Sequence, residues 1–533
     1  MKWRQCLALS AVFAALTALG LLVFPGHSFL LSDTQIYIPL FEHLRDSRLL
    51  NSDLILSGAH LSYTIYDEVS LALNRTLGFS FEQVLFGQQF VFRWLGYWGA
   101  FWLARACGLP LGASVLTSTL LWLGAFVYGP AIITTEFEPV PRGFAVPLVV
   151  ASLGALAAGH RNASAVLIAI AFLYHAPAVW PVLLIALILR DWRTLSTVAG
   201  AAILLLSFAH YQPGTVQAQP FFSLIDPVHR EILQSRAAYN WISLWPWQYW
   251  AQYLLTATLA LAAFARIRSI LPPAVQPYFR WMPLIGLAMM PISYLLLEQL
   301  GWALFPQVQP MRSLLYCHLF CQWLAPIAAW REIKDRNWSR AACWMIVPLS
   351  LSLRGDLLNI PPDGWWQQAL LLAVLFAAVY IAAKWPRREW AWAACFLVSL
   401  FFGEVLNARA YKPVASNSLD ALAVWAKDRT PTDSVFLFGD LGRRLEPGIF
   451  RARSTRAVYV CWKQGGQVNY FPQYAQIWWE RWRALLAPNH PPLDYNDLRR
   501  RGIHYLVLTT QNPTRDIPAV YASPGYRVYQ LNP

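Results

Sequence analysis

Charged residues are scarce in this chain. Only 13% of its 533 residues are Asp, Glu, Lys or Arg, whereas 57% are hydrophobic. An average soluble protein has about 25% charged and about 45–50% apolar residues. A set of soluble domains could not cover its surface with so few charges, so that class of protein is excluded. The composition instead predicts a polytopic α-helical membrane protein.

Several chemical signatures are also missing. No Walker loop, Ser/His/Asp signature, dinucleotide glycine fingerprint or HExxH motif occurs where its mechanics would work, so we do not expect ATP-driven transport by this chain alone. The seven cysteines lie almost entirely in apolar segments, which argues against a disulfide framework or a thiolate zinc site. The net charge of +14 is explained by basic cytoplasmic loops rather than by nucleic acid, which we do not expect as a partner.

Apolar runs alternate with basic turns along the chain. The first run follows Lys2 and Arg4 and exceeds the apolar core of about 7–15 residues in a signal peptide, so it predicts a retained helix with a cytoplasmic N-terminus. Nearly every later turn that this start assigns to the cytoplasm is basic, as the positive-inside rule demands. The predicted segments are Leu7–Phe24, Val84–Ala104, Leu111–Tyr128, Phe144–Ala158, Ala163–Leu189, Leu195–Phe208, Trp247–Ala265, Met282–Leu297, Leu314–Trp330, Ala341–Leu353, Gln368–Ala383 and Trp390–Phe402.

One of these runs has basic residues at both ends. The 27 residues of Ala163–Leu189 reach only about 40 Å as a helix, whereas two crossings need about 60 Å. Pro177 and Pro181 therefore predict the turn of a short helical hairpin. Counted as two, it brings the total to about thirteen segments, and this odd number places the C-terminus outside.

The chain is predicted to have two domains. Residues 1–402 form a transmembrane domain with outer loops 27–83, 129–143 and 209–246. Residues 403–533 form a small extracytoplasmic α/β domain, because strand-like runs starting at Ser434, Ala457, His504 and Tyr526 alternate with helical patterns. The helical patterns lie around Leu419–Lys427 and Tyr474–Leu486.

The first outer loop contains Ser32-Asp33-Thr34-Gln35. A carboxylate just outside the membrane can serve as a general base or as a metal ligand. Asp33 can equally be the N-cap of a helix that begins at this point. The local sequence leaves both interpretations open.

The second outer loop places Glu136 and Glu138 ahead of Arg142. Two carboxylates followed by an arginine could hold a metal or grip a phosphate. Alternatively, this is a solvated loop in which the arginine pairs with one glutamate. No Asp-x-Asp motif occurs, so the sequence neither requires nor excludes a divalent metal, and the cofactor is otherwise unknown.

Two ionisable residues are expected near the membrane. Arg312 lies where an outer loop re-enters the bilayer, and it could bind a phosphate bidentately or snorkel to ordinary headgroups. His175 lies at the hairpin turn, where an ionisable group is a functional candidate, although it could simply bond freed backbone carbonyls. In the tail, a basic run predicts either a solvated face or contact with anionic lipid or glycan. That run consists of Arg443, Arg444, Arg451, Arg453 and Arg456, with Lys463 nearby.

Together these features resemble the GT-C-type membrane glycosyltransferases, which take a sugar from a polyprenyl-phosphate donor on the outer membrane face. The resemblance rests on the cytoplasmic N-terminus, the acidic residue in the first outer loop, the many helices and the C-terminal outer domain. Within that superfamily the chain is most similar to a group of uncharacterised bacterial polytopic membrane proteins. The similar stretches are Asp33-Thr-Gln-Ile-Tyr-Ile-Pro, Pro141-Arg142, Tyr174-His175-Ala-Pro, Gln309-Pro-Met-Arg312 and Trp425-Ala-Lys-Asp-Arg-Thr-Pro-Thr-Asp-Ser-Val-Phe.

The resemblance implies roles for particular residues. Asp33 would be the base that activates the acceptor, with Glu136 and Glu138 as further catalytic candidates. Arg142 and Arg312 would face the donor phosphate. The secondary candidates are His175 and Tyr37. The chain departs from the family in having one acidic residue, rather than a pair, at this point of the first loop.

The resemblance also implies partners and a location. The donor would be a polyprenyl-phosphate-linked sugar, and the acceptor would be a glycan, a lipid or a protein. The reaction would take place at the outer face of a bacterial cytoplasmic (inner) membrane, where the chain would also contact membrane lipids. Two other classes stay open: a lipid-linked glycan transporter and a non-catalytic membrane scaffold of envelope glycan assembly. A transporter would place ionisable residues deep in its helices and often show repeat symmetry, whereas most of them here lie at the predicted outer boundary.

Overall fold

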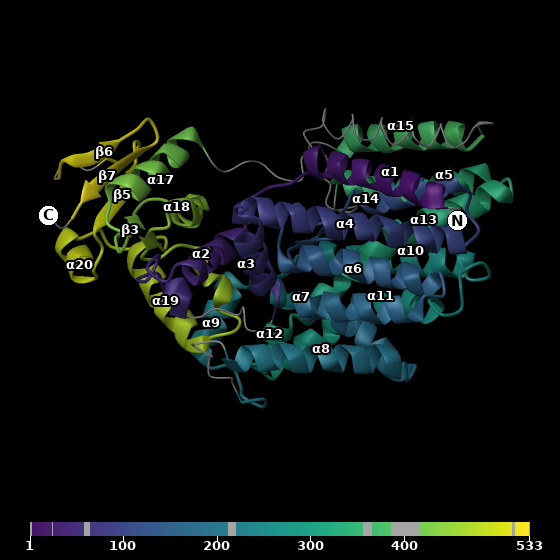
Figure 1. Ribbon diagram of the computed structural model, residues 1–533, viewed down its shortest axis with the longest axis horizontal. Coiled ribbons are helices and arrows are strands. Elements are labelled where there is room, and N and C mark those ends of the chain that lie inside the picture. Colours follow the sequence, from purple (N-terminus) through teal and green to yellow (C-terminus); the bar gives the residue numbers. More distant parts are fainter. Residues whose placement is uncertain are drawn as a thin grey trace. The chain divides into compact units, whose positions relative to one another are not determined.

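The computed structural model describes residues 3–23, 25–57, 64–211, 220–354, 365–384, 416–513 and 517–531. Within these ranges it does not describe the side chains of residues 208–211, 352–354, 365–372, 374 and 375. The chain is mostly helical and divides into two compact units (Figure 1). Unit 1 comprises residues 1–27, 86–207 and 239–410, and unit 2 comprises residues 28–85, 208–238 and 411–533.

Unit 1 is built of helices that lie alongside one another in Figure 1. Four helices of the described chain are long and apolar enough to cross a membrane: Trp3–Leu22, Arg161–Ile188, Trp247–Ile267 and Gln276–Gln299, in which a π-helical turn follows α11. The total of thirteen segments and their orientation stay predictions. The helices are α1 (Trp3–Leu22), α4 (Phe81–Ala106), α5 (Leu111–Leu121), α6 (Pro141–Ala157), α7 (Arg161–Ile188), α8 (Trp192–Tyr211), α10 (Trp247–Ile267), α11 (Gln276–Ser293), α12 (Phe305–Val308), α13 (Leu315–Lys334), α14 (Trp338–Arg354) and α15 (Trp365–Lys384).

Helix α7 is interrupted where the hairpin was predicted. Its backbone leaves the helical region at His175, with φ −160° and ψ 86°. Pro177 follows at once in the first turn of the second half, where the missing N–H of a proline costs no helical hydrogen bond. The break lies two residues before Pro177, whereas the predicted hairpin, with both of its ends on the cytoplasmic side, stays a prediction.

The predicted segment Leu111–Tyr128 is wrong in its second half. Helix α5 ends at Leu121, and the chain then forms a two-stranded antiparallel hairpin of β1 (Phe126–Val127) and β2 (Ile132–Ile133). Gly124 has φ +78°, a left-handed conformation that cannot continue a helix. An unbroken apolar run hid this turn, because hydrophobicity alone does not separate helix from strand.

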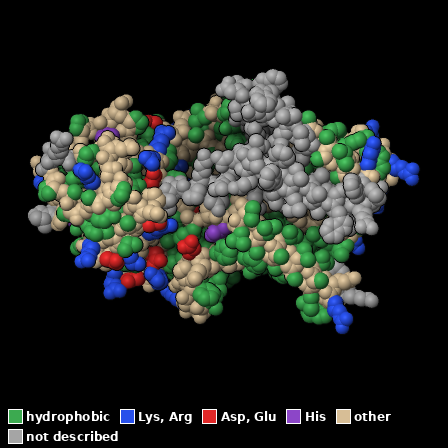
Figure 2. Space-filling view, turned by 90° about the horizontal axis from the view of Figure 1, so that it is seen from above, with side chains coloured by type: hydrophobic (Ala, Val, Ile, Leu, Met, Phe, Trp, Pro, Cys, Tyr) green, Lys and Arg blue, Asp and Glu red, His purple; other side chains and the backbone are tan. Residues whose placement is uncertain are grey.

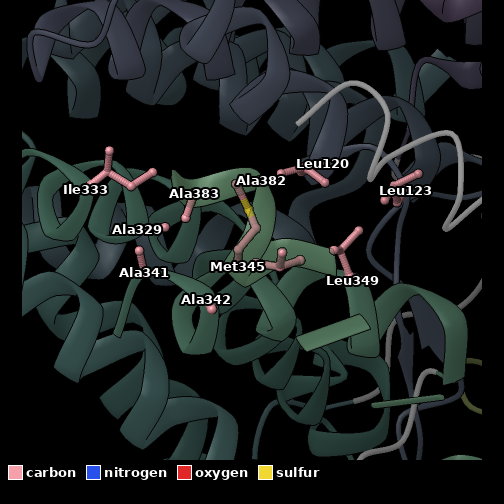
Figure 3. Packing of buried hydrophobic residues seen from close by; sticks show 11 residues of the cluster. Leu120, Leu123, Ala329, Ile333, Ala341, Ala342, Met345, Leu349, Ala382 and Ala383 are labelled. Carbon is pink, nitrogen blue, oxygen red and sulfur yellow. The ribbon is translucent and has the colours of Figure 1, made fainter. Parts of the chain in front are cut away.

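The core of unit 1 includes a cluster in which small and large side chains alternate (Figure 3). It joins α5, α13, α14 and α15. Alanines from three of these helices allow close approach, while leucine, isoleucine and methionine fill the gaps between them. The cluster consists of Leu120, Leu123, Ala329, Ile333, Ala341, Ala342, Met345, Leu349, Val379, Ala382 and Ala383.

Unit 2 contains a five-stranded sheet in the order β4-β3-β5-β7-β6. The neighbours of β3 are parallel to it, and β7 runs antiparallel to both β5 and β6. The four predicted tail strands are present. The prediction missed β6, which is short and largely exposed and has no apolar alternation. The strands are β3 (Val435–Phe438), β4 (Ala457–Val458), β5 (Tyr505–Thr509), β6 (Ala519–Ala522) and β7 (Tyr526–Gln530).

Helices from three parts of the sequence complete unit 2. Residues 28–85 and 208–238 cluster with the C-terminal residues rather than with the helices of unit 1. The predicted domain limit at residues 402 and 403, and the segment Trp390–Phe402, lie outside the described residues. The helices are α2 (Thr34–Arg45), α3 (Tyr66–Leu77), α9 (Pro227–Arg236), α17 (Asn417–Arg429), α18 (Glu446–Ser454), α19 (Pro472–Leu485) and α20 (Tyr495–Arg500), with the 3₁₀ turns η1 (Leu54–Ser57) and η8 (Gln464–Gln467).

The two units have different surfaces. Figure 2 shows acidic and basic side chains gathered over unit 2, while the coloured surface of unit 1 is largely hydrophobic with basic side chains at one end. On α8, for example, Trp192, Ile203 and Leu206 are all more than half exposed. A helix with such a surface suits lipid rather than water, which supports the prediction of a membrane protein.

Candidate functional site

Asp33 occupies the N-cap position of α2, but its side chain makes no capping hydrogen bond. Instead, its Oδ1 atom lies 3.3 Å from the ammonium of Lys463 and accepts a hydrogen bond of 3.3 Å from the Ser32 hydroxyl. The same ammonium donates to Ser32 Oγ at 2.6 Å. The carboxylate is 29% exposed and the lysine side chain 12%. The predicted helix start and N-cap position are therefore present without the capping hydrogen bond, and the Asp33 side chain belongs to a polar cluster with a lysine of the tail.

Glu136 and Arg142 form an ion pair in unit 1. Arg142 Nε lies 2.5 Å from Glu136 Oε1, and both side chains are largely buried. Pro141 begins α6, so Arg142 lies in the first turn of that helix. Gly143 allows the start of α6 to lie close to Glu136, because a Cβ atom at this position would be 2.8 Å from Glu136 Cβ. The expected pairing is present, but the loop is not solvated.

Glu138 shares this buried environment, with 1% of its surface exposed. A buried carboxylate needs a partner to offset its desolvation, so Glu138 is part of the packed structure and not a solvated loop residue. The structure does not test its catalytic role, which stays a prediction.

A buried polar network that the sequence interpretation missed supports Glu136. Its backbone carbonyl accepts hydrogen bonds from Gln89 Nε2 at 2.8 Å and Arg93 Nη2 at 2.7 Å. Gln89 Oε1 lies 2.7 Å from His27 Nδ1. Burial lowers the pKa of His27, and Arg93 lowers it further against the opposing hydrogen bond with Gln89. A signal was available, because Gln89 and Arg93 interrupt the apolar run Val84–Ala104, and an ionisable residue in such a run is a functional candidate.

Arg312 and His175 are brought together at the break in α7. Arg312 Nη1 lies 3.0 Å from His175 Nε2. Since a guanidinium can only donate, His175 Nε2 must accept, and the imidazole is neutral with its proton on Nδ1. Arg312 lies on the 3₁₀ turn η6 (Pro310–Leu314), directly after Gln309, whose φ of +51° turns the chain sharply.

Tyr37 is buried in α2 of unit 2. Its ring packs edge-on against that of Tyr66, with ring centroids 5.1 Å apart. This contact explains its position as part of the core of unit 2. Its role as a secondary site residue stays a prediction.

The basic run of the tail does not form one solvated face. Arg451 is fully buried and forms an ion pair with Asp53, and Arg456 is 3% exposed. Arg443 and Arg444 are exposed, and the guanidinium of Arg443 lies over the ring of Trp462. The run therefore contains structural and surface arginines side by side. On α18, for example, Arg451 is buried and Arg453 is exposed.

In the described part of the chain, no group of three or more His, Cys, Asp or Glu side chains is arranged to hold a metal ion. In unit 1 the structure brings together Glu136 and Arg142, whose pairing was expected, and Arg312 and His175, which were predicted as separate candidates. Asp33 is assembled in unit 2 with Lys463, which the sequence interpretation placed only in a basic run.

Comparisons with known proteins show the fold. Residues 417–485 match a domain of unknown function, DUF6798, and no curated protein sequence matches the chain. The crystal structure of ArnT from Cupriavidus metallidurans in the apo state is similar, with a TM-score of 0.53 and 13% identity over 99% of this chain and 98% of ArnT. The structure of ArnT bound to undecaprenyl phosphate has a TM-score of 0.50 and 14% identity over 100% of this chain and 99% of ArnT. At this low identity the similarity shows the fold, and the chain therefore has the same fold as ArnT.

Proposed function

We propose that this chain is a membrane glycosyltransferase that transfers a sugar from a polyprenyl-phosphate-linked donor to an acceptor hydroxyl. It shares its fold with ArnT over nearly the whole length of both chains, and ArnT binds undecaprenyl phosphate in one structure. The observation that carries the proposal is the incomplete compensation of the Arg312 charge in unit 1.

Arg312 is a cation without a carboxylate partner among the described residues. Its one hydrogen bond there is to the neutral ring of His175, and its Nε atom is buried with no acceptor. Desolvating a charge is unfavourable unless the charge is paired and hydrogen-bonded. A phosphate would supply both the charge and the acceptors, and its geometry matches the planar guanidinium. We assign the donor phosphate to Arg312.

Arg142 is a second candidate for the donor phosphate, but its charge is opposed by Glu136. Glu136 fits a positioning role, because its paired side chain is only 5% exposed, whereas the Asp33 carboxylate is 29% exposed and can be reached by an acceptor. This leaves Asp33 as the preferred base, with Glu138 as the alternative.

The proposed reaction is a substitution at the anomeric carbon of the sugar. The bond from that carbon to the phosphate oxygen breaks, and a bond to the acceptor oxygen forms. The hydroxyl proton passes to the Asp33 carboxylate as general base. The polyprenyl phosphate leaves with an additional negative charge, which an arginine stabilises. This chemistry needs no nucleotide, in keeping with the absence of nucleotide-binding motifs.

The test uses purified protein in lipid nanodiscs with a radiolabelled polyprenyl-phosphate sugar. Arg312→Lys should bind donor more weakly although it keeps the charge, because an ammonium cannot form the planar fork. Arg312→Ala should be weaker still. Arg280→Lys, which changes an exposed arginine of the same unit, is the matched control. Unchanged donor binding in both Arg312 variants would exclude the phosphate role.

The base is tested by turnover at matched expression. Asp33→Asn should lose about 10²–10⁴-fold, the usual contribution of a general base. The variant should still fold, because the Asp33 side chain does not cap α2. Glu136→Gln and Glu138→Gln are measured beside it, and collapse of Glu138→Gln alone would move the base there. Normal turnover in all three variants, or no transfer by the unaltered protein, would favour the scaffold.

A further inference from the structure

Lys463 joins the tail to Asp33 within unit 2. It lies in the turn between β4 and η8, 430 residues after Asp33 in the sequence. The Lys463 ammonium and the Ser32 hydroxyl both meet the same oxygen of Asp33, Oδ1. Two contacts on one oxygen fix the plane of a carboxylate, and they thereby set the direction in which Oδ2 points.

The turn that carries Lys463 is itself held rigidly. Gln464 Nε2 donates to Asp53 Oδ1 at 2.9 Å, and Gln464 Oε1 accepts from the Cys461 backbone at 2.7 Å. The Gln464 carbonyl accepts from the Tyr474 hydroxyl at 2.8 Å. Gln464 and its three partners are all buried, so the lysine projects from a packed turn.

The first turn of α2 is fixed by the same part of the tail. The buried Arg451 guanidinium donates to the Gln35 carbonyl at 2.6 Å and also lies 3.3 Å from Asp53 Oδ1. Asp53 Oδ2 accepts from the Val458 backbone at 3.1 Å. One buried carboxylate, Asp53, thus connects both the turn of Lys463 and the start of α2.

Two glycines of the tail make this close packing feasible. A Cβ atom at Gly448 would lie 1.9 Å from the side-chain oxygen of Gln35, and one at Gly466 would lie 2.4 Å from Ile36 Cδ1. Real Cβ contacts are never so short, so a side chain at either position would force the Gln35 or Ile36 side chain to move. The sequence keeps both sides of the Asp33 turn in direct contact with the tail.

We infer that Lys463 is a positioning residue for the Asp33 carboxylate, and that the C-terminal region completes the group that activates the acceptor. This inference rests on the proposed function. The ammonium and the Ser32 hydroxyl hold Oδ1, and the carboxylate makes no capping hydrogen bond to α2. Asp33 then takes the acceptor proton while Oδ1 stays bound to Lys463 and Ser32.

If Lys463 and Asp33 formed only an ordinary surface ion pair, replacing Lys463 would not change turnover. Exposed pairs contribute about 0–1 kcal/mol to stability and have no bearing on turnover. The Lys463 side chain is only 12% exposed, and its ammonium contacts two groups of the first segment. The experiment must therefore separate loss of orientation from loss of fold.

The variants are Lys463→Gln, Lys463→Arg and the matched control Lys427→Gln, which changes an exposed lysine of the same unit. We expect Lys463→Gln to lower kcat about 10²-fold, the effect of a small misplacement of a reacting group. The KM for the polyprenyl-phosphate sugar should not change. Lys463→Arg should recover much of the loss, and Lys427→Gln should match the unaltered protein.

Asp33 supplies an internal control. In the Asp33→Asn background, Lys463→Gln should cause no further loss, because the group that it positions is already inactive. Equal losses in both backgrounds, or a normal kcat for Lys463→Gln in an otherwise active enzyme, would overturn the positioning role and leave the proposed function intact.

A second measurement does not depend on turnover. Acetic anhydride labels free amines, and mass spectrometry gives the fraction of Lys463 that is modified. An ammonium bound to a carboxylate is protected, so Asp33→Asn should raise labelling of Lys463 several-fold while labelling of Lys427 stays constant. Equal labelling would show that the contact is absent. If the unaltered protein transfers no sugar, the proposed function fails, and the catalytic role of Lys463 fails with it.

Discussion

One arginine of each unit shows a different way of compensating a charge. In unit 2, Arg451 is fully buried and is met by the equally buried carboxylate of Asp53. In unit 1, Arg312 has only a neutral histidine, and the buried Arg93 donates to a backbone carbonyl while its Nη1 atom has no acceptor. The paired charge of Arg451 is structural, whereas the charge of Arg312 is left to pair with a ligand.

This difference leads us to expect that Arg451 contributes to stability and Arg312 to ligand binding. A buried ion pair that loses one member leaves the other charge uncompensated, which is strongly destabilising. A cation that has no carboxylate partner leaves no such orphan when it is removed. The two kinds of arginine should therefore give opposite results when each is replaced by methionine, which has a similar reach and no charge.

The largest expected effect is on folding. Arg451→Met should destabilise the protein by about 3–5 kcal/mol, because Asp53 would stay buried without its cation. Arg312→Met should leave the melting temperature unchanged or slightly higher. Both are measured as apparent melting temperatures in the same detergent. A loss in Arg312→Met as large as that in Arg451→Met would remove the distinction between the units.

A second test concerns an acidic residue of unit 2 that lacks compensation. Asp67 in α3 is 2% exposed, and its Oδ1 atom has no hydrogen-bond partner among the described residues. Burial raises the pKa of Asp67 far above its ordinary value of 3.8, and the neighbouring Glu68 adds to the rise. The folded state therefore binds more protons than the unfolded state above pH 3.8, so stability falls as pH rises.

Asp67→Asn removes this titration. The variant should be more stable than the unaltered protein at pH 7, by about 1–3 kcal/mol for a buried unsatisfied group. The gain should disappear below about pH 4, where the unaltered carboxyl is already neutral in both states. Thermal unfolding at pH 4 and pH 7 measures both arms, and a gain of equal size at both pH values would contradict the assignment.

The smallest effect is expected at an exposed ion pair of unit 2. Arg483 lies 3.7 Å from Glu231, and both side chains are more than half exposed. Arg483→Gln should change stability by less than about 1 kcal/mol, because solvent screens such pairs. A clear drop in melting temperature would mean that this exposed pair makes a substantial contribution to the packing of α9 against α19.

The features that the sequence predicted are those with local causes. The break near Pro177 follows from the missing amide of proline, and the pairing of Glu136 with Arg142 follows from their separation of six residues. The tail strands showed their apolar runs directly. In each case, the chemistry is contained in a few consecutive residues.

The features that the sequence did not predict depend on distant contacts. No spacing rule connects Asp33 with Lys463 or Asp53 with Arg451, since each pair is separated by about 400 residues. The basic run likewise gave no indication that α18 would bury Arg451 and leave Arg443 exposed. Tertiary packing decides which of these residues are buried, and the periodicity of the sequence does not contain that information.

The contact between Asp53 and Arg451 spans 398 residues, which affects the timing of biosynthesis. At a synthesis rate of about 5–20 residues per second, Arg451 is made about 20–80 s after Asp53. Throughout that interval, residues 28–85 lack the cation, the glycine contacts and the strand that surround them in the finished protein. The nascent chain must therefore keep this segment soluble and unaggregated until nearly its last residues are made, which makes it a natural client for a chaperone.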